Sequence, residues 1–378
     1  MPAKNQATEE SAFKNWINED LVKRTAHHIQ FHYPTFASKE FIKVSHELPA
    51  LELKPRMRLI CDFLKTHLPS NYKKALAILM KAALEPSPKM KPLTGFDLWA
   101  FTEFIQRYGL EDFDESMAAL KELTSRFTGE FAIRPFLIKE EKRTLKVLHQ
   151  WARDPNHHVR RLVSEGSRPR LPWGEQLKHF IKDPTQTIEL LEKLKYDEEL
   201  YVRKSVANHL NDISKDHPKL AVQVASKWLK EAPEKHKVKI KWIVKHALRT
   251  LLKKGDKDAL NLLGFENSAK VIIQNFKLSK KEVKVGDSLE FSFDLKSPKD
   301  CQVMIDYLVH HQKNNGETAP KVFKLAIKNL KGKEPLALKK KHSFKPITTR
   351  TYYPGTHFIE IMVNGVLLAK AKFELKTK

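Results

Sequence analysis

The segment "WARDPNHHVRRLVSEGSRPRLPWG", residues 151–174, concentrates side chains that could do chemistry. Glu165 stands among arginines, and Trp173 follows in a short stretch that also contains two prolines. We expect Gly166 to end the preceding helix, so the stiff loop after it is suited to presenting side chains. A carboxylate in such a place can stabilise a positively charged sugar or base and orient a water for attack at an anomeric carbon.

An internal repeat of 43 residues predicts how this segment is positioned. The stretch 154–167 aligns with 197–212. Each stretch begins with an aspartate and has a Val-Arg pair that starts five residues later, at 159–160 and at 202–203. This period and pattern are typical of HEAT-like repeats, whose second helices line one concave face. A third basic stretch, 235–255, predicts another long amphipathic helix with cations on that face.

The second copy of the repeat carries Asp212 one turn beyond the position that matches Glu165. Neighbouring second helices could bring the two carboxylates to the same groove. Both have structural alternatives, because Glu165 lies four residues after Arg161 and could form an ion pair within the helix. Asp212 could likewise cap a turn or pair with Lys204 or Lys215.

The composition indicates a nucleic-acid-binding protein. Among 378 residues, 69 Lys and Arg stand against 45 Asp and Glu, a net charge of +24 that attracts polyanions. An anionic membrane is the rival partner, but we find no apolar run of about 18 residues and the first residues are polar. Only Cys61 and Cys301 are present, and no metal-binding spacing or cofactor motif stands out. We therefore expect a soluble intracellular protein that needs no metal or cofactor.

The fold class is predicted as mainly α, a HEAT-like α-solenoid with a C-terminal all-β immunoglobulin-like sandwich. Apolar residues recur at helical spacing up to about residue 263, which predicts about ten or more helices of roughly 10 to 18 residues. Period-2 alternation then predicts about seven short strands, with "VNG" at 363–365 marking a hairpin. The predicted domains are 1–266 and 267–378.

The C-terminal region is predicted to make a second contact with nucleic acid. Residues 270–378 hold 22 Lys and Arg against 10 Asp and Glu, a net charge of +12. Its basic run at 329–346 could be a solvated face or a loop that touches the duplex backbone.

Four motifs between residues 120 and 255 resemble those of the AlkC family of bacterial DNA glycosylases, relatives of AlkD built from HEAT-like repeats. They are "SRFTGEFAIRPFL", "VRRLVSEGSRPRLPWG", "VRKSVANHLNDISKDHP" and "KIKWIVKHALRTLLKKG". The C-terminal region also resembles the immunoglobulin-like domain of one AlkC subgroup. The resemblance implies hydrolysis of the N-glycosidic bond of cationic 3-methyladenine and 3-methylcytosine in double-stranded DNA, without the base pocket of flipping enzymes. It further implies a monofunctional, monomeric enzyme of the bacterial cytoplasm, associated with the nucleoid.

By this resemblance, Glu165 would face the deoxyribose of the lesion and Asp212 would lie beside it. Trp173 would pack on the sugar and backbone, and Glu130 is the fourth catalytic candidate. Each of the last two has a structural alternative. Trp173 could be a loop anchor buried against the next helix, and Glu130 could be a charge near a helix N-terminus.

The candidate DNA contacts are mostly cations of the repeats and of the loop, and some Val-Arg arginines could instead bridge neighbouring repeats. The candidates are Arg134, Arg160, Arg161, Arg168, Arg170, Arg203, Lys204, Asn208 and His209. The alternative function is a non-catalytic HEAT-repeat scaffold that binds DNA or an acidic protein through the same groove. Such a scaffold would bind in a salt-dependent way but release no base.

Overall fold

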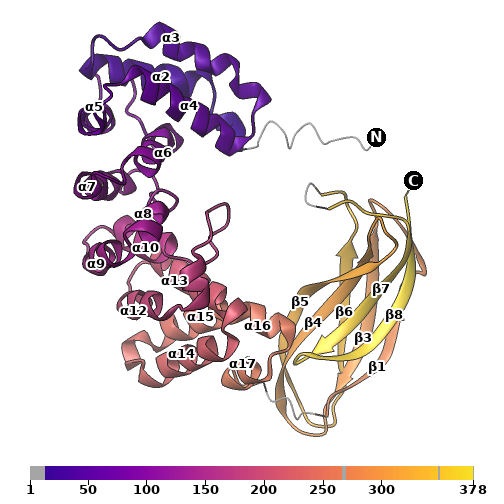
Figure 1. Ribbon diagram of the computed structural model, residues 1–378. Coiled ribbons are helices and arrows are strands. Elements are labelled where there is room, and N and C mark those ends of the chain that lie inside the picture. The colour runs from indigo at the N-terminus through magenta and orange to yellow at the C-terminus, as the bar shows by residue number, and fades with distance from the viewer. Residues whose placement is uncertain (1–12, 266–269, 348–349, 378) are drawn as a thin grey trace. The chain divides into compact units, whose positions relative to one another are not determined.

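The computed structural model describes residues 13–265, 270–347 and 350–377 (Figure 1). The described chain is helical up to α17 (Lys257–Leu262) and forms strands from β1 (Ile272–Leu278) onward, which confirms the predicted fold class. Among the described residues, no helix is long and apolar enough to cross a membrane.

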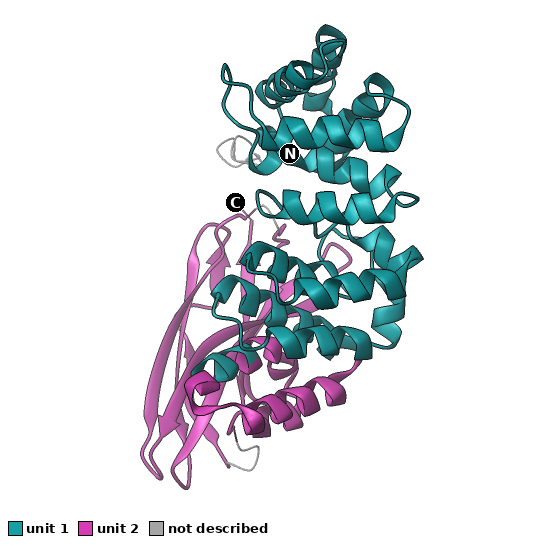
Figure 2. Ribbon diagram, turned by 90° about the vertical axis from the view of Figure 1, so that its left-hand side faces the viewer, with its two compact units in different colours: residues 1–216, 238–243 teal, residues 217–237, 244–378 magenta. Residues whose placement is uncertain are grey.

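The chain divides into two compact units, which Figure 2 shows in different colours. Unit 1 comprises residues 1–216 and 238–243, and unit 2 comprises 217–237 and 244–378. The predicted boundary between residues 266 and 267 lies outside the described residues. Unit 2 also takes in helices that the prediction assigned to the first domain.

Unit 1 is built from short helices joined by tight turns. Several of these helices begin with a side-chain N-cap. At the start of α10 (His157–Gly166), for example, the side-chain Oδ1 of Asn156 accepts a hydrogen bond from the backbone amide of His158 at 2.8 Å. Its α-helices are α2 (Glu19–His32), α3 (Ser38–Ile42), α4 (Leu53–His67), α5 (Tyr72–Leu84), α6 (Trp99–Tyr108), α7 (Phe113–Thr124), α8 (Arg134–Lys139), α9 (Glu141–Trp151), α10 (His157–Gly166), α11 (Lys178–Lys182), α12 (Thr185–Leu194) and α13 (Leu200–Asp216). Its 3-10 turns include η1 (Phe13–Trp16) and η4 (Gly95–Leu98).

The predicted 43-residue repeat is present in the structure. Helices α12 and α13 follow α9 and α10 at this spacing, and in Figure 1 α9 and α12 stack in one column while α10 and α13 lie in a second. Arg160 Nη1 donates to the carbonyls of Asp154 and Pro155, both at 2.9 Å. Arg203 makes the same two bonds 43 residues later. These bonds close the turn that enters each second helix.

The third basic stretch is not one long helix, so this prediction was wrong. It forms a 3-10 turn followed by α15 (Lys237–Ala247) and α16 (Arg249–Lys254), with a break at Leu248. Arg249 Nη1 donates to the carbonyl of His246 at 2.6 Å, which satisfies an acceptor at the end of α15.

Unit 2 contains two sheets that share one apolar core. A three-stranded sheet has the order β1-β3-β6 and a five-stranded sheet the order β2-β8-β7-β4-β5. The core between them includes Phe291, Phe293, Ile305 and Ile361. The strands are β1 (Ile272–Leu278), β2 (Glu282–Lys284), β3 (Ser288–Lys296), β4 (Cys301–Gln312), β5 (Thr318–Leu330), β6 (Leu336–Ser343), β7 (Gly355–Val363) and β8 (Val366–Lys376). Helices α14 (Pro218–Glu231), α16 and α17 (Lys257–Leu262) also belong to this unit, whereas α15 is divided, with residues 238–243 in unit 1 and its two ends in unit 2.

The hairpin predicted at "VNG" joins β7 to β8. Val363 pairs with Val366, and Asn364 and Gly365 have φ angles of 46° and 78°, as a two-residue type I′ turn requires. Gly365 packs directly on Gly255, the left-handed residue that ends α16. A Cβ added to Gly365 would lie 2.4 Å from the Cα of Gly255, so neither position has room for a side chain.

Most of the basic run at 329–346 belongs to the end of β5 and to β6, which rules out the loop alternative for that part and agrees with the alternative of a solvated face. Residues 336–343 form β6 and pair in antiparallel fashion with β3. Lys339 and Lys341 are exposed, whereas His342 is buried in the sandwich.

Candidate active site

Glu165 lies in the last turn of α10 and is only 6% exposed. Its Oε1 accepts from Arg168 Nη1 at 2.6 Å, and its Oε2 accepts from Ser205 Oγ on α13, also at 2.6 Å. The predicted ion pair with Arg161 is present, with 3.6 Å between Nη2 and Oε1.

The electrostatic surroundings keep Glu165 ionised. Burial alone would raise the pKa of Glu165, but the charges of Arg161 and Arg168 and the hydrogen bond from Ser205 lower it below its ordinary value. The carboxylate therefore carries its negative charge at neutral pH, although it is shielded from water.

Asp212, about one turn before the C-terminal end of α13, is 1% exposed and shares Arg168 with Glu165. Its Oδ2 accepts from Arg168 Nε at 2.8 Å, and its Oδ1 accepts from Lys215 Nζ at 2.8 Å. The structure thus brings the two predicted carboxylates to one guanidinium, and of the two lysines considered as partners of Asp212 it selects Lys215.

Glu130 is joined to the same group of charges by Arg161. Arg161 Nη1 donates to Glu130 Oε2, and Thr128 Oγ1 donates to the same carboxylate oxygen at 2.7 Å. The guanidinium of Arg161 also lies 4.9 Å from the ring centroid of Tyr201. Carboxylates and cations alternate along the resulting charge chain, which consists of Glu130, Arg161, Glu165, Arg168, Asp212 and Lys215.

Arg134 holds the loop after α10 and is only 1% exposed. Its Nη1 donates to the carbonyls of Gly166 and Arg168 at 2.8 and 2.9 Å, and its Nε donates to that of Glu175 at 2.5 Å. Burial lowers the pKa of Arg134 to about 10. These bonds commit Nη1 and Nε of Arg134 to the backbone of the loop, and its predicted contact with DNA stays a prediction.

Trp173 is exposed, so its interpretation as a buried loop anchor was wrong. The residue is 66% exposed, and its backbone has a φ of 62°, in the left-handed region. The carbonyl of Trp173 accepts a hydrogen bond from Lys54 Nζ of α4. An exposed indole on a braced loop is suited to stacking on a ligand at the surface.

The arginines of the Val-Arg pairs have structural partners. Arg160 binds Asp197 of the next repeat through Nε at 2.6 Å and Nη2 at 3.0 Å, so it bridges neighbouring repeats, as its alternative role predicted. Arg203 closes the equivalent turn of its own repeat. Arg170, in the loop, makes a bidentate pair with Asp216 and keeps about a third of its side chain exposed.

His209 is fully buried, which corrects its assignment as a backbone contact for DNA. Its Nδ1 lies 2.9 Å from the carbonyl of Ser164 and must donate to it. Burial lowers the pKa of His209 to about 3, so the ring is neutral at neutral pH. Lys204 is exposed and Asn208 is half-buried, and their contacts with DNA stay predictions.

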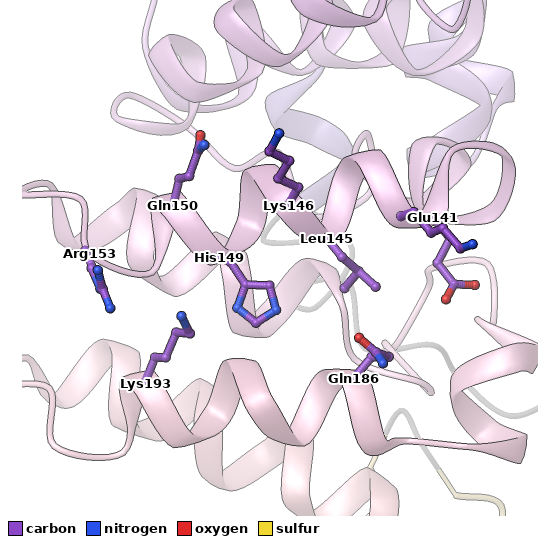
Figure 3. A pocket seen from close by; sticks show the side chains of 9 residues that line it. Glu141, Leu145, Lys146, His149, Gln150, Arg153, Gln186 and Lys193 are labelled. Atoms are coloured by element: carbon purple, nitrogen blue, oxygen red, sulfur yellow. The ribbon is translucent and has the colours of Figure 1, made fainter.

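A cavity of about 570 Å³ lies between α9 and α12 and contains no residue of the charge chain (Figure 3). Arg153, His149 and Lys193 are among its lining residues. Among the residues that the structure describes, no cluster of His, Cys, Asp and Glu could hold a metal ion.

Ser205 and Lys54 contact the site but were missed from the sequence. A signal existed for Ser205, because the 43-residue repeat aligns it with Leu162, which is buried on the packing face of α10. A polar residue at a packing position requires a partner, and here that partner is Glu165. Lys54 carries no such signal, since it lies 119 residues before Trp173.

Comparisons with known proteins place both regions of the chain in described families. Residues 130–251 match the family model described as DNA alkylation repair enzyme, and residues 272–377 match the C-terminal Ig-like domain of the uncharacterised protein YhaZ. The chain is 41% identical over 364 residues to the uncharacterized protein YhaZ of Bacillus subtilis (strain 168), covering 96% of this chain and 99% of that protein.

A solved structure covers almost the same length. It is the Pseudomonas fluorescens alkylpurine DNA glycosylase AlkC bound to DNA containing an abasic site analog, 38% identical with a TM-score of 0.88. The match covers 97% of this chain and 99% of that chain. In this chain a HEAT-like helical region is followed by an immunoglobulin-like domain, and the protein therefore belongs to the AlkC family of DNA glycosylases.

Proposed function

We propose that the protein is a DNA-repair glycosylase that hydrolyses the N-glycosidic bond of cationic 3-methyladenine and 3-methylcytosine in duplex DNA. The observation that carries this proposal is the buried, ionised carboxylate of Glu165, which Arg168 joins to Asp212 of the next repeat. The similarity to an alkylpurine DNA glycosylase supports the alkylated purine, 3-methyladenine, as a substrate.

In the proposed reaction, the bond between C1′ and the base nitrogen breaks, and its electron pair neutralises the cationic base. The deoxyribose passes through an oxocarbenium-like state, which the negative charge of Glu165 stabilises. A water oriented by Asp212 forms the new bond to C1′ and loses a proton, which is released to the solvent. The products are a neutral free base and an abasic site. No covalent intermediate is needed, which supports a monofunctional enzyme that leaves the strand intact.

The lowered pKa of Glu165 bears on the choice of substrate. An ionised carboxylate cannot donate a proton at neutral pH, so Glu165 cannot protonate a neutral base to help it leave. A base that carries a positive charge from alkylation leaves without that help. We infer that the site favours cationic lesions over neutral ones.

The exposure of Trp173 supports reading the lesion at the protein surface, without a pocket for a flipped base. The indole would pack on the sugar and backbone next to the lesion, while Lys204 and Asn208 would contact phosphates. We further propose that the protein works as a monomer in the bacterial cytoplasm, near the nucleoid.

The test is incubation of N3-methylated duplex DNA with the full-length protein, followed by chromatography of the liberated bases. We expect release by the wild-type protein and a loss of at least about 10²-fold in Glu165→Gln and Asp212→Asn, both of which still bind DNA. Glu189→Gln, an exposed glutamate of α12, is the matched control and should keep full activity. Salt-dependent binding without release by the wild type would favour the scaffold alternative, and full activity in both site variants would refute the assignment.

A further inference from the structure

Lys54 links α4 to the loop that presents Trp173. Its Nζ donates to the carbonyl of Trp173, and the same ammonium lies 4.7 Å from the ring centroid of Phe131. We propose that Lys54 is a positioning residue, which fixes the backbone that directs the Trp173 indole to the lesion. The inference rests on the proposed role of Trp173 in the glycosylase reaction.

The local environment of Lys54 is unfavourable for a cation. It is the second residue of α4, where the positive end of the helix dipole disfavours an ammonium. Burial lowers the pKa of Lys54, and the nearby charge of Glu103 only partly opposes this effect. The carbonyl of Trp173 and the ring of Phe131 are therefore the contacts that compensate an ammonium held in this place.

The backbone of Trp173 needs such a contact. A residue with a side chain stays in the left-handed region only where its surroundings hold it there. The amide of Gly174 donates to the carbonyl of Leu171 at 3.1 Å, and Arg134 binds the carbonyl of Glu175. Lys54 and Arg134 thus hold the carbonyls on either side of Gly174.

The side chain of Trp173 cannot provide the restraint itself. Because Trp173 is 66% exposed, little packing fixes the direction of its indole, which must come from the backbone that carries it. Without the bond from Lys54, the carbonyl of Trp173 can turn and the residue can relax toward the right-handed region. A shift of roughly 1 Å at a stacking group is enough to lower a rate by about 10²-fold.

The control for this idea lies on the same helix. Lys65 also donates to a carbonyl, that of Ser70 at 3.4 Å, and its ammonium lies 5.1 Å from the ring centroid of Tyr108. Lys65→Met therefore removes the same kinds of contact from α4 without touching the Trp173 loop.

The experiment measures single-turnover base release from a 3-methyladenine duplex and hydrogen exchange of residues 169–177 in the full-length protein. We expect Lys54→Met to slow release by roughly tenfold or more at saturating enzyme, with little change in duplex affinity, and to speed exchange in the loop. Lys54→Arg should restore part of the rate, because a guanidinium can still donate to the carbonyl. Lys54→Gln keeps a side-chain hydrogen-bond donor but removes the positive charge, so it separates these two contributions. Lys65→Met should match the wild type in both measurements.

Wild-type rates and unchanged loop exchange in Lys54→Met would overturn the inference. Slower release without faster exchange would also overturn it, since Lys54 would then act on the DNA directly. If the wild-type protein released no base, the proposed function itself would fail, and the exchange measurement would still decide whether Lys54 holds the loop.

Discussion

The Nε of Arg168 lies 2.8 Å from Oδ2 of Asp212, and this bond ties the loop after α10 to the second helix of the next repeat. The same guanidinium donates to Glu165 through Nη1. One arginine therefore sets the relative position of the two carboxylates, and all three side chains are buried. A buried charge without a partner is unfavourable, so removing any one of the three side chains leaves an uncompensated charge and destabilises the arrangement.

Arg168→Met should destabilise the protein by about 3–5 kcal/mol and abolish base release, because it leaves two buried carboxylates without their common partner. Arg168→Lys should fall between this variant and the wild type, since one ammonium lacks the fork that reaches both carboxylates. Urea titration of the full-length chain measures the loss. Arg153→Met, at an exposed arginine, should change stability by no more than about 0.5 kcal/mol. A stable Arg168→Met protein would contradict the role given to the charge chain.

The hydrogen bond from Ser205 to Glu165 predicts a change in the pH profile. Ser205→Ala removes a bond that favours the ionised carboxylate, so the pKa of Glu165 should rise. Activity that depends on ionised Glu165 is lost as pH falls through that pKa, and the acid limb of base release should therefore move to higher pH. We also expect a stability loss of about 1–3 kcal/mol.

The control for Ser205 is another buried serine of α13. Ser214 Oγ donates to the carbonyl of Asn211 at 2.8 Å, and its side chain makes no contact with Glu165. Ser214→Ala should leave the acid limb where it is. The measurement is the single-turnover rate of base release between pH 4.5 and 8, and an equal shift in both variants would argue against a specific effect on Glu165.

The scaffold was predictable because local and repeated patterns determine it. The Val-Arg pairs at 159–160 and 202–203 marked the entry to each second helix, and the structure shows why: each arginine closes its own turn. The role of Arg134 was not predictable in the same way. Its burial depends on carbonyls supplied by a loop that starts 32 residues later, and no spacing in the sequence encodes that approach.

The candidate site was predictable where its residues belong to the repeat. Glu165 and Asp212 sit at related positions of consecutive second helices, so alignment alone suggested that they meet. The sequence also suggested that several arginines contact phosphates, but Arg160, Arg161 and Arg168 are instead paired with carboxylates. Whether an arginine pairs with a carboxylate of the protein or with a phosphate of DNA depends on distances in the folded structure, and the composition of the sequence does not give these distances.

The contact between Gly365 and Gly255 predicts a position-specific cost within unit 2. Gly365→Ala places a Cβ 2.4 Å from the Cα of Gly255, in addition to the strain of a φ of 78°. Gly316 has a φ of 79° but nothing within 4 Å of an added Cβ, so Gly316→Ala bears only the strain, about 1 kcal/mol. Hydrogen exchange of β7 and β8 should be accelerated far more by the first variant. Equal effects of the two would show that crowding at Gly255 is unimportant.

Two buried histidines of the sandwich predict that unit 2 loses stability in acid. Burial lowers the pKa of His311 to about 3 and that of His342 to about 4, and the charge of Arg350 acts in the same direction on both. In the unfolded chain these rings take up protons near pH 6.5, so the stabilisation is complete above that pH and is lost as pH falls toward 4. Each histidine should contribute a slope of about 1.4 kcal/mol per pH unit in this window. The measurement is urea titration at several pH values, with hydrogen exchange of β4 as the probe. The unfolding free energy of His342→Phe should depend less steeply on pH than that of the wild type. An identical dependence in both proteins would rule out His342 as a source of the acid sensitivity.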